Sequence, residues 1–142
     1  MPRHSETRFL PYTPEQLFDL VADIERYPEF LPWCAAARIV ERKGDTVKAD
    51  LIVGYKALRE KFTSVVTLTP KSRIDVAYAG GPLSHLKNDW RFTPAPGGCD
   101  LSFDLEFALK STLLAGMMEA FLEKAIMRMA QAFEERAKAV YG

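Results

Sequence analysis

The sequence predicts an α+β fold in which a curved antiparallel sheet of about six to seven strands surrounds a long C-terminal helix, with short N-terminal helices. Two observations predict this arrangement. The spacing of apolar residues changes from the helical period of 3.6 to the strand period of 2 near residue 34, and it returns to 3.6 after residue 110. Short turn sequences separate the alternating runs, which is typical of antiparallel strands that follow one another.

The N-terminal part is predicted to contain a strand and a short amphipathic helix. Thr7 to Leu10 forms the short strand. A helix is predicted from Pro14 to Asp23, because Thr13 can cap it, Gln16 completes a capping box, and proline suits the first helical position. The apolar segment Tyr27 to Trp33 contains two prolines and is predicted to form one helical turn and a loop.

The middle of the chain is predicted to form about six consecutive strands. Turn sequences such as Lys43 to Asp45 and Pro70 to Ser72 separate them. The run from Leu86 to Phe92 is the least regular, and the run from Leu101 to Leu109 is the most regular. The positions predicted to share the inner face are Ala37 and Ile39; Ala49, Leu51, Val53 and Tyr55; Phe62, Ser64, Val66 and Leu68; Ile74, Val76 and Tyr78; and Leu101, Phe103, Leu105, Phe107 and Leu109.

The last part of the chain is predicted to be one helix from Thr112 to Val140, of about eight turns, because no proline interrupts its pattern. Gly116 lowers its helix propensity without ending it. Its apolar stripe consists of Leu114, Met117, Met118, Phe121, Leu122, Ala125, Met129, Ala132 and Phe133.

Length and composition limit the class of protein. A chain of 142 residues fits one domain, which we expect to span residues 1–142. The formal net charge is zero, so the chain has no global field for DNA or anionic membranes. The two cysteines are too few for a disulfide scaffold, and the N-terminus lacks the apolar core of a secretory signal. No apolar stretch reaches the roughly 18 residues of a spanning helix, so we expect a soluble cytoplasmic protein.

The predicted architecture favours an apolar cavity. A curved sheet does not touch a straight helix along its whole length, so a gap is expected at one end. Methionines such as Met117 and Met118 suit a site that is sometimes filled, although core packing explains methionines at this spacing equally simply. The segment Phe30 to Trp33 is predicted either to lie at the mouth of the cavity or to pack in the core.

The sequence offers no convincing catalytic set. The polar residues that an enzyme could use in such a cavity are Tyr55, Glu60, Tyr78 and His85, and Glu60 alternatively reaches solvent at the sheet edge. His4 is expected to lie in a frayed terminus. Cys34 and Cys99 have no histidine nearby in the sequence, and no cofactor, zinc or nucleotide-binding motif is present.

Four motifs resemble one known family. They are Phe18-x-x-Val21-Ala22-Asp23-x-Glu25-x-Tyr27-Pro28-x-Phe30-Leu31-Pro32-Trp33-Cys34, Glu60-x-Phe62-Thr63-Ser64, Gly81-Pro82-Leu83-x-x-Leu86-x-x-x-Trp90-x-Phe92, and Ala132-Phe133-Glu134-x-Arg136-Ala137-x-x-x-Tyr141-Gly142. Together they resemble the coenzyme Q-binding branch of the START-like superfamily, which is related to polyketide cyclases. The resemblance covers nearly the whole chain in order. This family usually has phenylalanine at the position of Leu83, a small departure.

The resemblance implies a helix-grip fold and non-catalytic binding of ubiquinone or a related isoprenoid quinone, in support of respiration or quinone synthesis. It implies contact with the inner membrane face or a respiratory complex. The same family includes bacterial ribosome-association toxins and cavity enzymes of the polyketide cyclase type, so these two roles stay open. The residues expected to bind the ligand are Phe30, Leu31, Pro32, Trp33, Val53, Tyr55, Phe62, Tyr78, Leu86, Trp90, Leu114, Met117, Met118, Phe121 and Leu122.

Overall fold

The computed structural model describes residues 3–55, 58–110 and 112–142, with side chains described for 3–54, 59–110 and 119–142. The strands and helices follow one another as β1 (Arg3–Leu10), α1 (Pro14–Ala22), the 3-10 helix η1 (Ile24–Glu29), β2 (Cys34–Lys43), β3 (Thr46–Tyr55), β4 (Leu58–Thr69), β5 (Arg73–Gly80), β6 (Leu83–Ala95), β7 (Gly98–Leu109), α2 (Thr112–Met127) and α3 (Met129–Tyr141).

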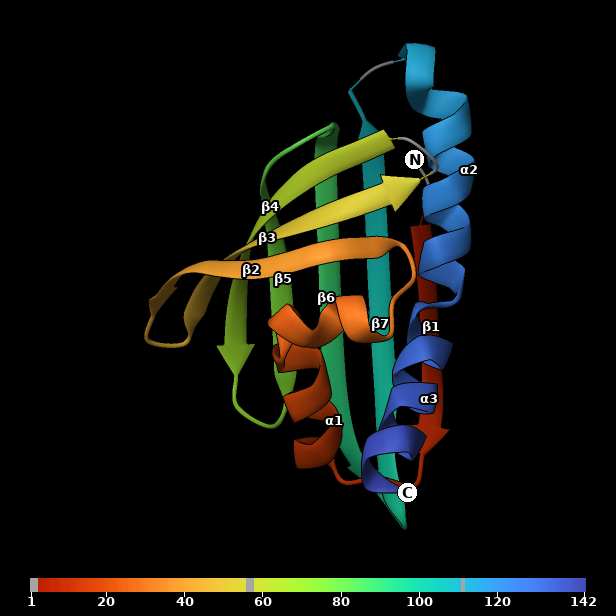
Figure 1. The fold of residues 1–142 in the computed structure, drawn as a ribbon. Coiled ribbons are helices and arrows are strands. Elements are labelled where there is room, and N and C mark those ends of the chain that lie inside the picture. The colour runs from red at the N-terminus through yellow and green to blue at the C-terminus, as the bar shows by residue number, and fades with distance from the viewer. Residues whose placement is uncertain (1–2, 56–57, 111) are drawn as a thin grey trace.

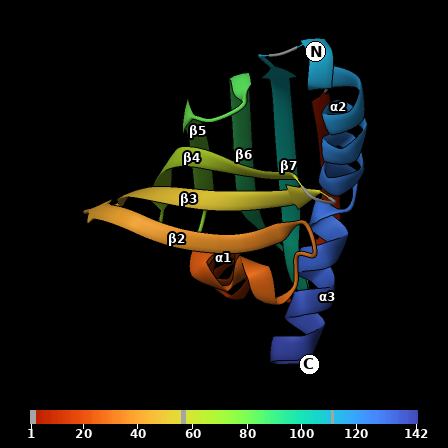
Figure 2. The ribbon, with the colours of Figure 1, turned by 45° about the horizontal axis from the view of Figure 1, so that its top comes forward.

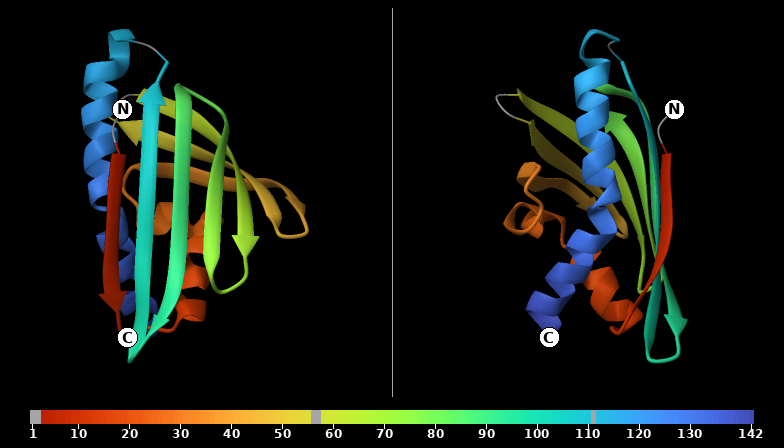
Figure 3. Two further views of the ribbon diagram at one scale, coloured as in Figure 1. Left: turned by 180° about the vertical axis from the view of Figure 1, so that it is seen from behind. Right: turned by 90° about the vertical axis from the view of Figure 1, so that its right-hand side faces the viewer.

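The seven strands form one antiparallel sheet in the order β1-β7-β6-β5-β4-β3-β2. Strands β2 to β4 cross the direction of β5, β6 and β7 at a steep angle, so the sheet bends around the space beneath it (Figures 1 and 2). Helices α1, α2 and α3 all lie on the inner side of this bend (Figure 3). The predicted α+β helix-grip architecture with a curved sheet is therefore confirmed.

The N-terminal helix forms as its sequence predicts. The Gln16 amide donates to Thr13 Oγ1 at 3.1 Å, and the Thr13 amide donates to Gln16 Oε1 at 2.9 Å, so both halves of the capping box are present. The helix buries one apolar face through Leu17, Phe18 and Val21. The chain then tightens into η1, where the Arg26 amide donates to the carbonyl oxygen of Asp23, three residues back, at 3.2 Å.

The strand pattern is right in its alternation and wrong in some boundaries. Strand β1 begins at Arg3, four residues earlier than the predicted strand at Thr7, because it pairs with β7 along its whole length. His4, predicted to lie in a frayed terminus, is therefore a strand residue, and its ring lies 6.2 Å from that of Phe103. Strand β6 extends beyond the predicted run at both ends because it pairs with β7 from Leu83 to Ala95, with a register shift between Leu83 and His85.

The C-terminal helix differs from the prediction of a single straight helix. It breaks at Arg128, whose φ of −99° and ψ of 0° leave the helical region. The Arg128 amide donates to the Ala125 carbonyl oxygen at 3.3 Å, which is the tighter 3-10 pattern, and Ala132 resumes helical bonding to Arg128 at 2.9 Å. The break lets α2 continue beside β7 while α3 turns toward α1 (Figure 3).

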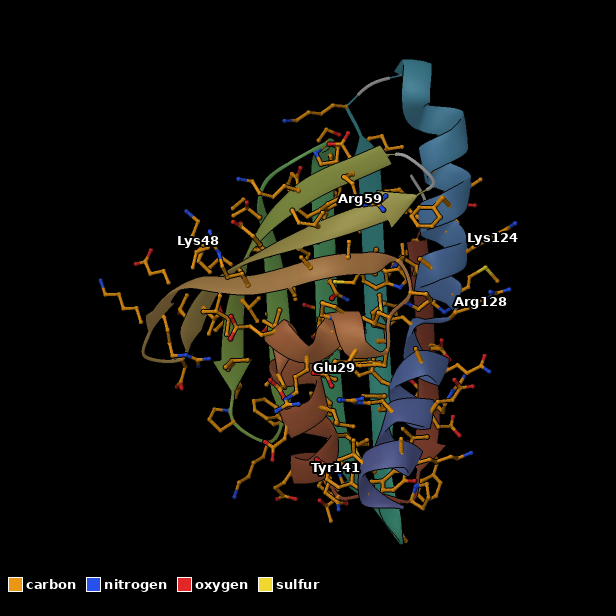
Figure 4. All side chains as sticks on the ribbon, viewed as in Figure 1. Glu29, Lys48, Arg59, Lys124, Arg128 and Tyr141 are labelled. Atoms are coloured by element: carbon orange, nitrogen blue, oxygen red, sulfur yellow. The ribbon has the colours of Figure 1, made fainter. Side chains whose placement is uncertain are left out.

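Polar contacts fix α3 to three N-terminal elements. Arg8 of β1 donates to Glu134 at 2.8 Å, and Arg136 donates to Glu29 of η1 at 2.7 Å. The Tyr141 hydroxyl donates to the carbonyl oxygen of Gln16 in α1 at 3.0 Å (Figure 4 labels Tyr141 and Glu29). These contacts set the position of α3 against the end of the cavity.

Candidate functional site: an apolar cavity under the curved sheet

A cavity of ≈ 140 Å³ lies between the inner face of the sheet and the helices, and its total empty space with open solvent included is ≈ 1020 Å³. Strands β3 to β7 supply the floor, α1 and η1 supply one wall, and the end of α2 with the start of α3 covers it. The side chains on the floor are Ala49, Leu51, Val53, Phe62, Ser64, Val66, Ile74, Val76, Leu83, Leu86, Asn88, Trp90, Leu105 and Phe107.

The floor follows from strand alternation. Inner-face residues of neighbouring strands lie opposite one another, as Ala49 and Ser64 do across β3 and β4, and Trp90 and Phe103 do across β6 and β7. The antiparallel pairing thus brings one row of apolar side chains per strand to a common surface. The cavity persists because the curved sheet leaves more room than the helices fill.

Buried polar groups on the floor fix the position of one aromatic ring. The Asn88 amide nitrogen donates to the Asp104 carbonyl oxygen at 2.9 Å, and its side-chain oxygen accepts from Trp90 Nε1 at 3.0 Å. Both ends of the Asn88 amide are therefore engaged, as a buried amide requires. Asn88 holds the indole of Trp90 in the wall of the cavity.

An aromatic cluster closes the cavity at α3. The Phe133 ring meets the rings of Tyr27, Phe30 and Trp90 edge to face, at centroid distances of 5.5, 5.0 and 5.0 Å. The Tyr27 hydroxyl donates to the Val21 carbonyl oxygen, and burial raises the pKa of Tyr27 well above its ordinary value. Tyr27 is therefore neutral at physiological pH and adds no charge to the cavity.

The predicted loop residues separate into different environments. Trp33 lines the cavity, whereas Leu31 is fully buried in the core and Pro32 is exposed. The Phe30 ring packs against Phe133 and lies under the Arg136 guanidinium, 5.0 Å from it. The sequence left two alternatives for this segment, a position at the mouth of the cavity or packing in the core. Leu31 packs in the core, whereas Trp33 lines the cavity. Their role in ligand binding stays a prediction.

The predicted strand residues mostly lie in the cavity. Val53, Phe62, Leu86 and Trp90 line it. Tyr78 lies outside the lining, and its hydroxyl accepts a hydrogen bond from the Leu83 amide at 2.9 Å. The side chain of Tyr55 lies outside the described residues.

In the described part of the C-terminal helices, the lining includes one predicted residue and several residues that were not predicted. Leu122 lines the cavity, whereas Phe121 packs against the core beside it. The side chains of Leu114, Met117 and Met118 lie outside the described residues. The remaining helical lining surrounds the break at Arg128 and consists of Ala125, Ile126, Met129 and Phe133.

The wall formed by α1 and η1 is one part of the site that the prediction omits. Val21, Ile24 and Tyr27 contribute it. The helical spacing of Val21 and Ile24 indicated an apolar face, but nothing in that spacing says which surface the face meets. Asn88 was detectable from its parity with Leu86 and Trp90, because a polar residue there must point inward.

Of the residues considered for catalysis, Glu60, Tyr78 and His85 lie outside the cavity lining, and the side chain of Tyr55 lies outside the described residues. His85 is half-buried and its Nε2 lies 3.3 Å from Glu106 Oε1, and Glu60 is half-buried as well. Burial raises the pKa of Tyr78, the Leu83 amide lowers it, and the Glu60 carboxylate raises it, with a net increase. Tyr78 is therefore a poor general base at neutral pH. Within the described residues, no cluster of potential metal ligands occurs.

The two cysteines are structural. Cys34 and Cys99 are both buried and unpaired, and burial raises the pKa of each thiol to about 11. A thiol with such a pKa is protonated at neutral pH and is a weak nucleophile. In the part of the chain that the structure describes, no helix is long and apolar enough to span a bilayer.

Comparison with known proteins assigns the family. Residues 10–134 match the family described as polyketide cyclase / dehydrase and lipid transport. The chain belongs to this family. Its resemblance to START-like proteins, inferred from the motifs above, is thereby confirmed.

Curated relatives within the polyketide cyclase / dehydrase and lipid transport family carry two kinds of name. The ribosome association toxin RatA of Rickettsia prowazekii is 42% identical over 94% of this chain and 94% of its own length. The mitochondrial coenzyme Q-binding protein COQ10 homolog B of Xenopus laevis is 32% identical over 98% of this chain and 59% of its own length.

Solved structures support the fold of this family. The 18 kDa protein CC1736 from Caulobacter crescentus is 41% identical, with a TM-score of 0.78 and coverage of 100% of this chain and 99% of that one. The Zhui aromatase/cyclase from Streptomyces sp. R1128 has a TM-score of 0.84 at 17% identity, covering 96% of this chain and 93% of that one. At that identity the likeness extends to the fold alone.

Proposed function

We propose that the protein binds one lipophilic molecule in the cavity, without catalysing a reaction on it, and that the molecule is ubiquinone or a related isoprenoid quinone. The observation that supports this proposal is a cavity whose lining is apolar except for a few fixed polar groups. Such lining is typical of sites for apolar ligands. The relative named as a coenzyme Q-binding protein favours a quinone among such ligands.

The size of the cavity limits how the ligand is bound. The cavity volume of ≈ 140 Å³ is small beside a whole isoprenoid quinone, so a long tail would extend through the open side of the cavity. A tail that leaves the protein could remain in a bilayer, which suits a carrier or chaperone that exchanges quinone at the cytoplasmic face of the inner membrane.

The first test is extraction of the native ligand. The protein is purified from a quinone-containing cell and extracted with organic solvent, and the extract is analysed by mass spectrometry for a stoichiometric quinone. Titration with decylubiquinone follows, with quenching of tryptophan fluorescence as the signal, because both Trp33 and Trp90 line the cavity. Absence of a bound quinone together with no saturable quenching contradicts the proposal.

A variant that fills the cavity locates the binding. Ala49 is 2% exposed and lies on the floor, so Ala49→Phe places a ring inside the cavity. Ala77→Phe is the matched control, because Ala77 lies exposed on the opposite face of β5. We expect Ala49→Phe to weaken decylubiquinone binding at least about tenfold and Ala77→Phe to leave it unchanged. Equal affinities would place the binding elsewhere.

A second candidate function is association with the ribosome. The relative at 42% identity is named a ribosome association toxin and matches nearly the full length of both chains. Zero net charge gives this proposal no global electrostatic support, so it needs a local contact surface. Co-sedimentation of the purified protein with the large ribosomal subunit at moderate salt tests it, and free sedimentation counts against it.

A further inference from the structure

Two buried polar residues, Asn88 and Ser64, lie on the cavity floor, and they differ in how their hydrogen-bonding groups are used. Asn88 engages both ends of its amide, with the Asp104 carbonyl and the Trp90 indole. Ser64 is 9% exposed and lines the same floor, yet its hydroxyl makes no hydrogen bond to any residue that the structure describes. An unpartnered buried hydroxyl is destabilising by about 1–3 kcal/mol, so its presence needs a reason.

The hydroxyl of Ser64 is open to the cavity. In the described part of the chain, every side-chain nitrogen or oxygen that is fully shielded from solvent has a hydrogen-bond partner. The Ser64 hydroxyl has no partner, so it is not fully shielded and faces the empty space of the cavity. Its cross-strand partners are Ala49 on β3, which also lines the floor, and Tyr78 on β5, which lies outside the lining. The side chains at 49 and 64 are small, so the cavity is deeper at this point and leaves room for part of a ligand.

The backbone around Ser64 is irregular. The register between β4 and β5 shifts between Thr63 and Ser64, because Thr63 pairs with Gly80 and Ser64 pairs with Tyr78. Ala79 is thus the extra residue of a β-bulge. Bulges are common beside binding sites, where they change the direction of a side chain.

A bound water is a poor occupant of this position. An ordered buried water makes about three hydrogen bonds to polar groups. The neighbours of Ser64 along its own strand on the inner face are Phe62 and Val66, and Ala49 lies across from it. The hydroxyl of Tyr78 is engaged with the Leu83 amide. A ligand oxygen carried by an apolar body satisfies Ser64 and fills the apolar surroundings together.

We propose that Ser64 hydrogen-bonds an oxygen of the lipophilic ligand, so that the cavity selects apolar molecules that carry a carbonyl or hydroxyl group over plain hydrocarbons. The proposal rests on the proposed function and specifies its ligand chemistry. The Ser64 hydroxyl donates to a carbonyl oxygen and either donates to or accepts from a hydroxyl. Specificity arises because a hydrocarbon leaves the hydroxyl unpaired, whereas an oxygen-bearing ligand pairs it.

The experiment compares Ser64→Ala with the wild-type protein by isothermal titration calorimetry, with decylubiquinone and decylbenzene as probes. The control variant is Ser72→Ala, at an exposed turn between β4 and β5. We expect Ser64→Ala to weaken decylubiquinone binding about five- to tenfold and to change decylbenzene binding less than about twofold. Ser72→Ala should match the wild type with both probes.

The stability of the ligand-free protein provides a second readout. Removing an unpartnered hydroxyl should keep or raise the melting temperature of Ser64→Ala. A lower melting temperature would show that the hydroxyl has a partner within the protein, and this overturns the proposal. Unchanged decylubiquinone affinity, or equal weakening of both probes, overturns it as well while leaving the proposed function intact. A wild-type protein that binds neither probe refutes the proposed function itself.

Discussion

Phe133 provides the most direct test of how α3 closes the cavity. Its side chain is 1% exposed and meets three aromatic rings from η1, the following loop and β6. Phe133→Ala removes the ring and enlarges the cavity on the side where the helices cover it. The free energy of unfolding should fall, because the lost burial and the lost ring contacts both stabilise only the folded state.

The expected loss is about 4–5 kcal/mol. Replacement of a buried phenylalanine by alanine costs about 3–5 kcal/mol. Edge-to-face pairs contribute about 0.5–1.5 kcal/mol each beyond the buried area, which puts Phe133, with three such pairs, in the upper part of this range. A domain at the lower end of the usual total stability of about 5–15 kcal/mol retains little after this change. Phe133→Leu keeps most of the volume and should cost about 1–2 kcal/mol.

Urea unfolding followed by far-ultraviolet circular dichroism and tryptophan fluorescence measures these losses. Phe9→Ala is the matched control, because Phe9 is 50% exposed on the outer face of β1. It should cost less than about 1 kcal/mol. If Phe133→Ala destabilises the protein no more than Phe9→Ala does, α3 does not depend on the aromatic cluster, and our explanation of how the cavity is closed is wrong.

Two further predictions concern the backbone and the thiols. Gly98→Ala should destabilise the protein by more than about 2 kcal/mol in thermal or urea unfolding, because a Cβ at Gly98 overlaps the carbonyl oxygen of Leu10. Gly80→Ala meets no atom within 4 Å and should be nearly neutral, so equal effects would contradict the steric explanation. At pH 8, iodoacetamide should label Cys34 and Cys99 about a hundredfold more slowly than free cysteine, because burial raises each thiol pKa to about 11. Labelling should accelerate as pH rises toward that value, and labelling of the folded protein at the free-cysteine rate would refute this prediction.

The sequence predicted the structure best where the conformation depends on neighbouring residues in the chain. The capping box at Thr13 and Gln16 predicted the start of α1, and the alternation of Leu101 to Leu109 predicted the inner face of β7. Both patterns depend on neighbours within a few residues. The same is true of Val53 and Phe62, whose parity places them on the cavity floor.

The sequence was less informative where distant segments decide the outcome. Nothing in the composition around Arg128 marks a helix end, since it contains no proline or glycine, and the break follows from packing against β7 on one side and α1 on the other. The position of the cavity follows that break, which explains why Ala125 and Ile126 line it in addition to the predicted Leu122. The alternation of β4 predicted that Ser64 faces inward. That its hydroxyl has no hydrogen-bond partner depends on the neighbouring residues of β3 and β5, which the sequence of β4 does not reveal.

The attachment of α3 to the N-terminal elements determines how late in synthesis the fold can be completed. Strand β1 is made first, yet its pairing partner β7 follows about ninety residues later, and the ion pair from Arg8 to Glu134 needs nearly the whole chain. A nascent chain that lacks α3 has neither Met129 nor Phe133 to cover the cavity. If the proposed function is right, the ligand is retained only after α3 has been made. Truncation of either end removes the ion pair between Arg8 and Glu134.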